Sequence, residues 1–146
     1  MTLSCSTSPA LPAAWRALLR VHACAARAVD SQLQAELGLT LTDSLVLEAL
    51  ATSTEGHVRP VDLAAVAGMT PSGMTRLLSG LEHAGLVCRT ACPNDRRVMH
   101  AQLTAEGRRM ADKATELQAA VAQESLTTLS PSEQQQLHDL LARLLP

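Results

Sequence analysis

Hydrophobic residues recur at helical spacing along most of the chain, and glycines, prolines and hydroxyl residues divide the pattern into separate helices. The first predicted helix begins near Pro9 or Pro12 and ends at Gly38. Its apolar side is one broad stripe of Leu11, Trp15, Leu18, Leu19, His22, Ala26, Val29, Leu33 and Leu37. Thr40 and Asp43 have the spacing of a capping box, which predicts a second helix to about Thr52.

Two short helices come next, with few residues between them. The first covers 61–67 and is closed by Gly68. Thr70 and Pro71 then form a helix start, because a hydroxyl N-cap is followed by proline at the first helical position. The buried side of this second short helix consists of Met74, Leu77, Leu78 and Leu81. So short a connection predicts a helix-turn-helix.

A β-hairpin is predicted after Gly85. Residues 86–90 read as a strand and 91–95 as a turn, and two adjacent arginines, Arg96 and Arg97, precede a second strand. In that strand Met99, Ala101 and Leu103 alternate with Val98, His100 and Gln102. Thr104 then caps a long helix to about Thr127, and Ser130-Pro131-Ser132-Glu133 is a capping box for the last helix.

These elements predict a mainly α fold with a small β-hairpin wing, in one domain covering 1–146. The winged helix-turn-helix lobe would cover 40–103, and a helical dimerisation region would consist of 9–37 and 104–146. A first helix of about 25 residues spans roughly 38 Å, which is longer than a domain of this size covers by itself. We therefore expect a second copy to bury the apolar terminal helices, with a three-helix bundle inside one chain as the alternative.

The composition excludes several classes of protein. Alanine and leucine together make a third of the chain, and there is one Trp with no Tyr or Phe. A β-sandwich or barrel core without these residues would be unusual. The same lack rules out base stacking on an aromatic platform, as in RRM or OB modules.

Charge is distributed unevenly around a net value of −2. Residues 59–113 hold eight of the twelve cations but only five of the fourteen acids, so a basic centre lies between acidic flanks. Eleven of the twelve cations are arginine, which suits bidentate contacts to phosphates and bases. This pattern indicates a local contact with a polyanion such as double-stranded DNA.

The hairpin and the helix before it resemble a known family. Residues 95–107, with Asp95-x-Arg97 followed by Leu103-Thr104-x-x-Gly107, are similar to the wing signature of the MarR family of winged helix-turn-helix regulators. Residues 75–78 and 81–87 resemble that family's recognition helix and its exit. The resemblance covers nearly the whole chain, from Trp15 to Leu145.

The resemblance implies a homodimeric transcriptional regulator, most often a repressor, that releases a pseudo-palindromic operator when a small molecule or an oxidant acts. It places the helix start at Thr70, Pro71, Ser72, Gly73, Thr75 and Arg76 against the major groove. Arg97 would enter the minor groove with Asp95 bracing it, and Arg96 would contact phosphate. An arginine in a narrow minor groove is favourable, because negative potential is concentrated there.

Signals for an effector are weaker. Trp15 and His22 lie on one helix face and could line a ligand pocket, although packing in the core is the favoured interpretation. Cys24 lies on the first helix, where the peroxide-sensing branch of the family keeps its reactive cysteine. That branch pairs it with tyrosines, which this chain lacks, so a buried inert thiol is the better interpretation. Cys88 and Cys92 are expected to be ordinary thiols.

No catalytic arrangement, metal-ligand spacing or phosphate-binding loop is readable, so we expect neither an enzyme nor a cofactor. No signal peptide or apolar run of membrane-spanning length is visible, and a reduced cytoplasmic setting is the expectation. Two other functions remain open. One is a thiol-based redox-sensing regulator, and the other is a winged helix that binds a protein partner without contacting DNA.

Overall fold

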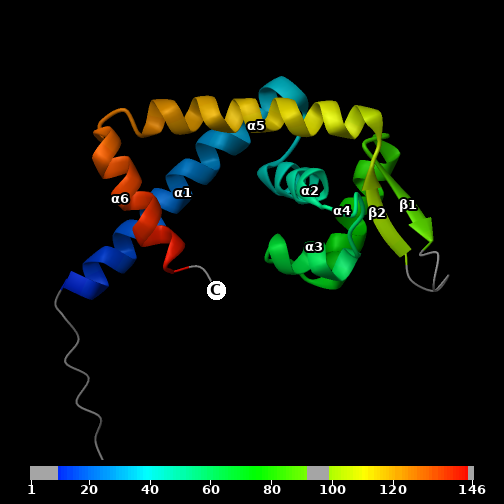
Figure 1. Ribbon diagram of the computed structural model, residues 1–146, viewed down its shortest axis with the longest axis horizontal. Helices are drawn as coiled ribbons and strands as arrows, with labels where there is room; N and C mark the ends of the chain where they lie inside the picture. The colour runs from blue at the N-terminus through cyan, green and yellow to red at the C-terminus, as the bar shows by residue number, and fades with distance from the viewer. Residues whose placement is uncertain (1–9, 92–98, 145–146) are drawn as a thin grey trace, which may run out of the picture.

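The computed structural model describes residues 10–91 and 99–144, and within these ranges the fold is mainly helical with a two-stranded antiparallel hairpin. Its elements in order are α1 (Ala10–Leu37), α2 (Leu41–Thr52), α3 (Pro60–Val66), α4 (Pro71–His83), β1 (Val87–Ala91), β2 (Met99–Leu103), α5 (Ala105–Ser125) and α6 (Pro131–Ala142). Helix α5 spans the length of the molecule, and α2, α3, α4 and the hairpin lie together at one end, away from α6 (Figure 1). The predicted fold class is therefore confirmed.

Four helix starts are stabilised by the caps that the sequence predicts. Thr40 and Ser130 each form a complete capping box, with Asp43 and Glu133 at the third helical position. The Thr70 hydroxyl accepts a hydrogen bond from the Gly73 amide at 3.2 Å, and the Thr104 hydroxyl accepts one from the Gly107 amide at 2.9 Å. Caps of this kind typically contribute about 1 kcal/mol each, and they fix where the helices begin.

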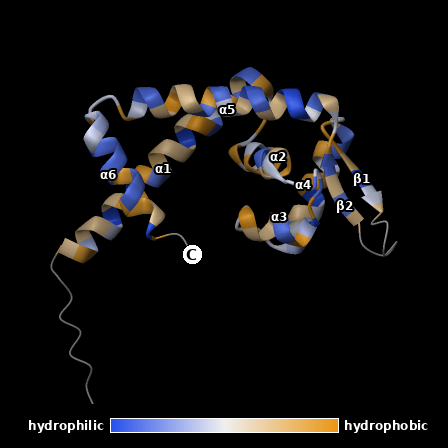
Figure 2. Ribbon diagram, viewed as in Figure 1, coloured by the Kyte–Doolittle hydropathy of each residue, from blue (hydrophilic) through white to orange (hydrophobic). Residues whose placement is uncertain are grey.

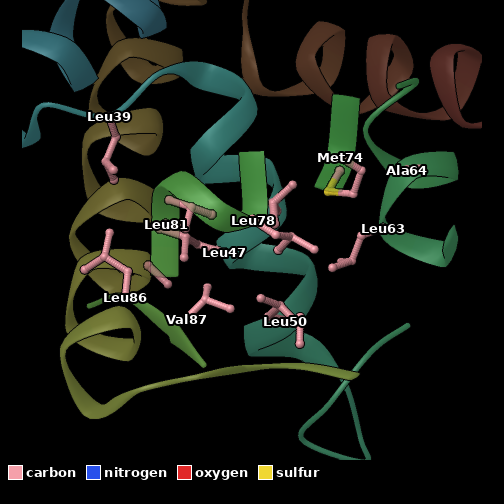
Figure 3. Close-up of a cluster of buried hydrophobic side chains, with 13 residues drawn as sticks. Leu39, Leu47, Leu50, Leu63, Ala64, Met74, Leu78, Leu81, Leu86 and Val87 are labelled. Atoms are coloured by element: carbon pink, nitrogen blue, oxygen red, sulfur yellow. The ribbon is translucent and has the colours of Figure 1, made fainter. Parts of the chain in front are cut away.

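The hydrophobic core lies between α2, α3, α4 and β1. Leu47, Leu50 and Leu63 are fully buried there, together with Met74 of α4 (Figure 3). Leu78 and Leu81 extend the buried side of α4, as the helical spacing predicts. The core thus holds α3 and α4 against α2, and it fixes which side of α4 remains outside.

The hairpin has one connection that sequence patterns did not predict. Strands β1 and β2 pair antiparallel, with Val87 opposite Leu103. Val58, in the loop before α3, forms a bridge to Ala101: its amide donates to the Ala101 carbonyl at 3.0 Å, and the Ala101 amide donates back at 2.8 Å. The loop before α3 is therefore tied to the wing.

The start of α5 fits tightly against the exit of α4. The Thr104 amide donates to the Leu86 carbonyl at 3.1 Å, and the Thr104 hydroxyl donates to the Gly85 carbonyl at 2.7 Å. Gly107 packs so closely here that a Cβ atom on it would lie 1.9 Å from the Leu86 oxygen. Only glycine permits this approach, which explains the glycine of the 103–107 motif.

The terminal helices expose much apolar surface within the single chain. Trp15 and Leu19 on α1 are 59% and 50% exposed, and Leu140 on α6 is 58% exposed. Helix α6 has no buried residue, and both α1 and α6 carry hydrophobic stretches (Figure 2). Among the described residues, no helix combines the length and hydropathy that a membrane crossing needs.

Candidate nucleic-acid interface

Helices α3 and α4 are joined by a tight turn, as the sequence predicts. Gly68 adopts a positive φ of 61°, a conformation that glycine accepts without strain. The Met69 amide donates to the Ala64 carbonyl at 2.8 Å, which closes the end of α3. Because Leu63 and Met74 are buried against each other's helices, the turn and the core together fix α4 relative to α3.

The opposite side of α4 is open to solvent. Ser72, Thr75 and Arg76 are exposed, as are Thr70 and Pro71 at the helix start, while Gly73 is half-buried. A Cβ atom on Gly73 would lie 3.2 Å from the capping hydroxyl of Thr70 and from the Met69 methyl group. The six predicted contact residues on α4 are therefore gathered at one exposed helix start.

The hydroxyl groups of this helix start are partly committed to the helix itself. Thr70 Oγ1 caps the Gly73 amide, and Thr75 Oγ1 donates to the Pro71 carbonyl at 2.9 Å. The Arg76 side chain makes no hydrogen bond or ion pair with any residue in the ranges 10–91 and 99–144. Its guanidinium is thus the long donor group of this face that remains free to bind a ligand.

A second arginine of the helix-turn-helix, at the start of α3, is already paired. Arg59, before α3, makes two hydrogen bonds to the Asp62 carboxylate, at 2.8 and 3.0 Å. The hydrogen bond from Arg59 holds the pKa of the Asp62 carboxyl below its ordinary value. The charge of Arg59 is therefore largely balanced within the protein, whereas that of Arg76 is not.

The predicted wing contacts Asp95, Arg96 and Arg97, and with them Cys92, lie outside the described residues. The described part of the hairpin ends at Ala91 on β1 and resumes at Met99 on β2, and these two residues are paired. The role of the three charged residues consequently stays a prediction.

Arg89 on β1 has contacts that sequence reasoning missed. Its Nη2 donates to Ser79 Oγ at 2.7 Å and to the Thr75 carbonyl at 3.3 Å, both on α4. Its Nε lies 3.3 Å from Glu82 Oε2 but forms no hydrogen bond, so only the charges pair there. Side chains two positions apart on a strand lie on the same side, so Arg89 lies on the side of the buried Val87. This spacing is the feature of the sequence from which an inward contact of Arg89 could have been predicted.

Three predictions on α1 need correction. Trp15 and His22 are both exposed, so their assignment to the core is wrong for the single chain. Neither lines the cavity of about 840 Å³ between α1 and α5, whose walls include Arg20 and Cys24. Cys24 is also exposed rather than buried, with an Arg27 guanidinium nitrogen 3.7 Å from its sulfur. The physical reason is that the fully buried residue of α1, Leu33, lies near the C-terminal end of the helix, whereas Trp15, His22 and Cys24 come before it at positions that the described chain leaves exposed.

In the ranges 10–91 and 99–144, no group of three or more His, Cys, Asp or Glu side chains could hold a metal ion. Cys88 is half-buried on β1, and its thiol lies 3.7 Å from the Gln102 carbonyl oxygen. The sequence predicts an ordinary thiol at this position. The described chemistry of the lobe is therefore that of hydrogen-bond donors and one free guanidinium.

Comparison with known proteins identifies related sequences. The model of the MarR family matches residues 37–98. The HTH-type transcriptional repressor Rv2887 from Mycobacterium tuberculosis is 34% identical over 108 residues, which cover 74% of this chain and 76% of that protein. The similarity thus extends beyond the helix-turn-helix itself.

Solved structures with the same fold include three that bear on function. AbsC from Streptomyces coelicolor, a MarR family transcriptional regulator, is 29% identical, covers 94% of this chain and 93% of its own, and has a TM-score of 0.80. Sco3205 from the same organism, solved in complex with DNA, is 26% identical over 91% of this chain and 84% of its own, with a TM-score of 0.80. Rv2887 in complex with salicylic acid covers 88% of this chain and 93% of its own at 34% identity, with a TM-score of 0.72.

Proposed function

Because the chain belongs to the MarR family of winged helix-turn-helix transcriptional regulators, we propose that two copies form a repressor that binds a pseudo-palindromic DNA operator and releases it when a small molecule binds. It is a transcriptional regulator and not an enzyme. The observation that carries the proposal is the exposed start of α4, with an unpaired Arg76 between small polar residues. Such a surface fits the major groove, where arginine reads guanine by a bidentate contact.

The geometry of α4 assigns different roles to its residues. Pro71 has no N–H and the Gly73 amide is capped, so Ser72 supplies a first-turn amide and a hydroxyl for a phosphate oxygen. The Thr75 hydroxyl donates inward to Pro71, which leaves its methyl group toward solvent for an apolar contact such as a thymine methyl. Arg76 would then provide the donor for a base edge.

Dimer formation is supported by the apolar surface of α1 and α6. Leu11, Trp15 and Leu19 on α1 are at least half exposed, and so are Leu140 on α6, at 58%, and Leu144 just after that helix, at 71%. Monomeric proteins rarely expose contiguous apolar patches of this kind. A two-fold pair joined through these helices would place two α4 helices one turn of the double helix apart, which is why we expect a pseudo-palindromic operator.

The effector is proposed to be an aromatic carboxylic acid bound between α1 and α5. Rv2887 was solved with salicylic acid, and the α1–α5 cavity here has largely apolar walls with Arg20 as its only charged residue. A larger cavity of about 970 Å³, between α2 and α3, carries three acids, Glu48, Glu55 and Asp62, against the single cation Arg59. A carboxylate would be repelled there and attracted beside Arg20.

The DNA-binding proposal is tested by single arginine substitutions. We expect Arg97→Ala and Arg76→Ala each to weaken binding to a duplex recovered by in vitro selection by about 1–3 kcal/mol. Arg76→Ala should lower the preference for that duplex over a scrambled one, because a base contact is lost. Arg96→Ala should weaken both duplexes equally and reduce the salt slope by about 1. Fluorescence anisotropy at several salt concentrations measures all three.

Arg27→Ala, at an exposed position in the C-terminal half of α1, is the matched control and should leave both affinities unchanged. If Arg76→Ala weakened both duplexes in parallel, α4 would not read bases where we place the contact. A protein that bound neither duplex in dilute buffer would instead favour a winged helix that contacts another protein.

The effector proposal is tested by thermal unfolding with sodium salicylate. At about ten times its dissociation constant, salicylate should raise the melting temperature by roughly 3–6 °C. Arg20→Met should remove this shift, whereas Arg59→Met, in the other cavity, should keep it. Cys24→Ser is also expected to keep it. A different result would favour thiol sensing over the carboxylate proposal. In that case an oxidant would release DNA and salicylate would not, and Cys24→Ser would abolish the release by the oxidant.

A further inference from the structure

We propose that Arg89 is a positioning residue that fixes the wing hairpin relative to helix α4, so that the two DNA-contacting elements act as one rigid unit. The inference rests on the DNA-binding function proposed above. Arg89 lies on β1, a strand that packs against α4, and the hairpin forms the outer end of the lobe (Figure 1). It joins two elements that are otherwise connected through the turn at Gly85 and the buried core.

The contacts of Arg89 run along one face of α4. Its partners Thr75, Ser79 and Glu82 are spaced four and three residues apart, so they lie one above another on the helix. The strongest contact is the 2.7 Å hydrogen bond from Nη2 to Ser79 Oγ. A single side chain of β1 therefore contacts α4 over two helical turns.

Ser79 closes this network. Its hydroxyl hydrogen is committed to the Thr75 carbonyl at 3.0 Å, so its oxygen is oriented to accept from Arg89. Arg89 itself reaches the same Thr75 carbonyl at 3.3 Å. Since the Thr75 side chain is one of the proposed base contacts, Arg89 holds the backbone of a residue that would lie in the major groove.

Only an arginine suits this arrangement. Its planar guanidinium donates from Nη2 while Nε stays beside the Glu82 carboxylate, and lysine has a single charged nitrogen that cannot occupy both places. The Arg89 side chain is 28% exposed, and its charge is balanced by Glu82. A balanced and mostly covered cation is poorly suited to neutralise a DNA phosphate, so its influence on binding must pass through the wing and α4.

The first experiment does not depend on DNA. Hydrogen exchange measured by mass spectrometry should be faster in β1 and in α4 of Arg89→Lys and of Ser79→Ala than in the wild-type protein, by about tenfold at the protected amides. The matched control is Arg108→Lys, because Arg108 also donates to a backbone carbonyl of another element, that of Ala51 at 2.8 Å. This control should leave β1 and α4 unchanged.

The second experiment measures the consequence for DNA. Arg89→Lys and Arg89→Met should both weaken binding to the selected duplex by about tenfold without changing the salt slope. In an Arg97→Ala background the loss from Arg89→Met should be smaller than in the wild-type protein, because the wing contact that Arg89 helps to position is already gone and only the contacts of α4 remain. The proposal is overturned if Arg89→Lys binds the duplex with full affinity while Arg89→Met lowers the salt slope by about 1. That pair of results would mean that Arg89 contacts a DNA phosphate.

The two experiments separate the possible failures. Unchanged exchange in β1 and α4 of Arg89→Lys overturns the positioning role even if DNA binding is strong. Faster exchange in a protein that binds neither duplex supports the coupling of wing and helix while removing the DNA-binding function on which its purpose rests.

Discussion

Replacing Gly107 by alanine is expected to destabilise the protein by at least ~3 kcal/mol, the largest effect of any single methyl group that we predict. The added Cβ would lie 1.9 Å from the Leu86 carbonyl oxygen and 2.9 Å from its carbon. Neither atom can move freely, because that oxygen accepts the hydrogen bond from the Thr104 amide. The start of α5 must therefore separate from the exit of α4 and from the start of β1. Urea unfolding followed by circular dichroism measures the loss.

Gly80→Ala is the matched control for this prediction. Gly80 lies on the exposed side of α4, and an added Cβ meets nothing within 4 Å. Alanine there should stabilise the protein by about 0.5–1 kcal/mol, because glycine is a poor residue for a helix interior. A Gly107→Ala protein as stable as the wild type would mean that α5 does not approach Leu86 as described.

Leu140→Asp is expected to raise the dissociation constant of the dimer by roughly a thousandfold or more, while the isolated chain keeps its fold. Leu140 is 58% exposed in the single chain, so aspartate there is well solvated in the monomer. In a two-fold interface the substitution is present twice, and each buried carboxylate without a partner costs about 3–5 kcal/mol. Sedimentation velocity over a range of concentrations measures the change.

Val66→Asp provides the comparison for this interface prediction. Val66 on α3 is 67% exposed, so the substitution removes a similar apolar side chain far from α6 along the chain. It should leave the dimer intact. If Leu140→Asp also remained dimeric, α6 would not lie in the interface, and the apolar surface of the terminal helices would require another explanation.

The helix starts were predictable from the sequence because their signals are local. A capping box requires two residues three positions apart, and Thr40 with Asp43 and Ser130 with Glu133 satisfy this without help from the rest of the chain. The positive-φ glycine at 68 follows from equally local rules. The order of these elements was sufficient to predict the helix-turn-helix and the hairpin.

Contacts between distant segments were not predictable in the same way. The bridge from Val58 to Ala101 and the contact of Arg89 with Ser79 depend on how the core places the hairpin against α3 and α4. Gly107 was recognised as part of a motif, but its reason, the approach to Leu86, emerges only in three dimensions. The number of residues between two such positions does not tell how far apart they lie in the folded protein.

The mistaken placement of Trp15 and Cys24 has a different cause. An apolar stripe predicts that a helix face is buried, but it does not say whether the same chain or a second copy covers it. Helix α1 buries Leu33 near its C-terminal end, whereas its N-terminal half exposes Leu11, Trp15 and Leu19 in the single chain. The exposed half is the part for which we propose a second copy.

The central claim, that two copies together bind a DNA duplex, is tested most directly by sedimentation of a labelled duplex titrated with the protein. We predict one complex containing two chains per selected duplex, whose affinity falls steeply as salt rises. A protein that sediments as a monomer and leaves the duplex unshifted in dilute buffer would contradict the claim.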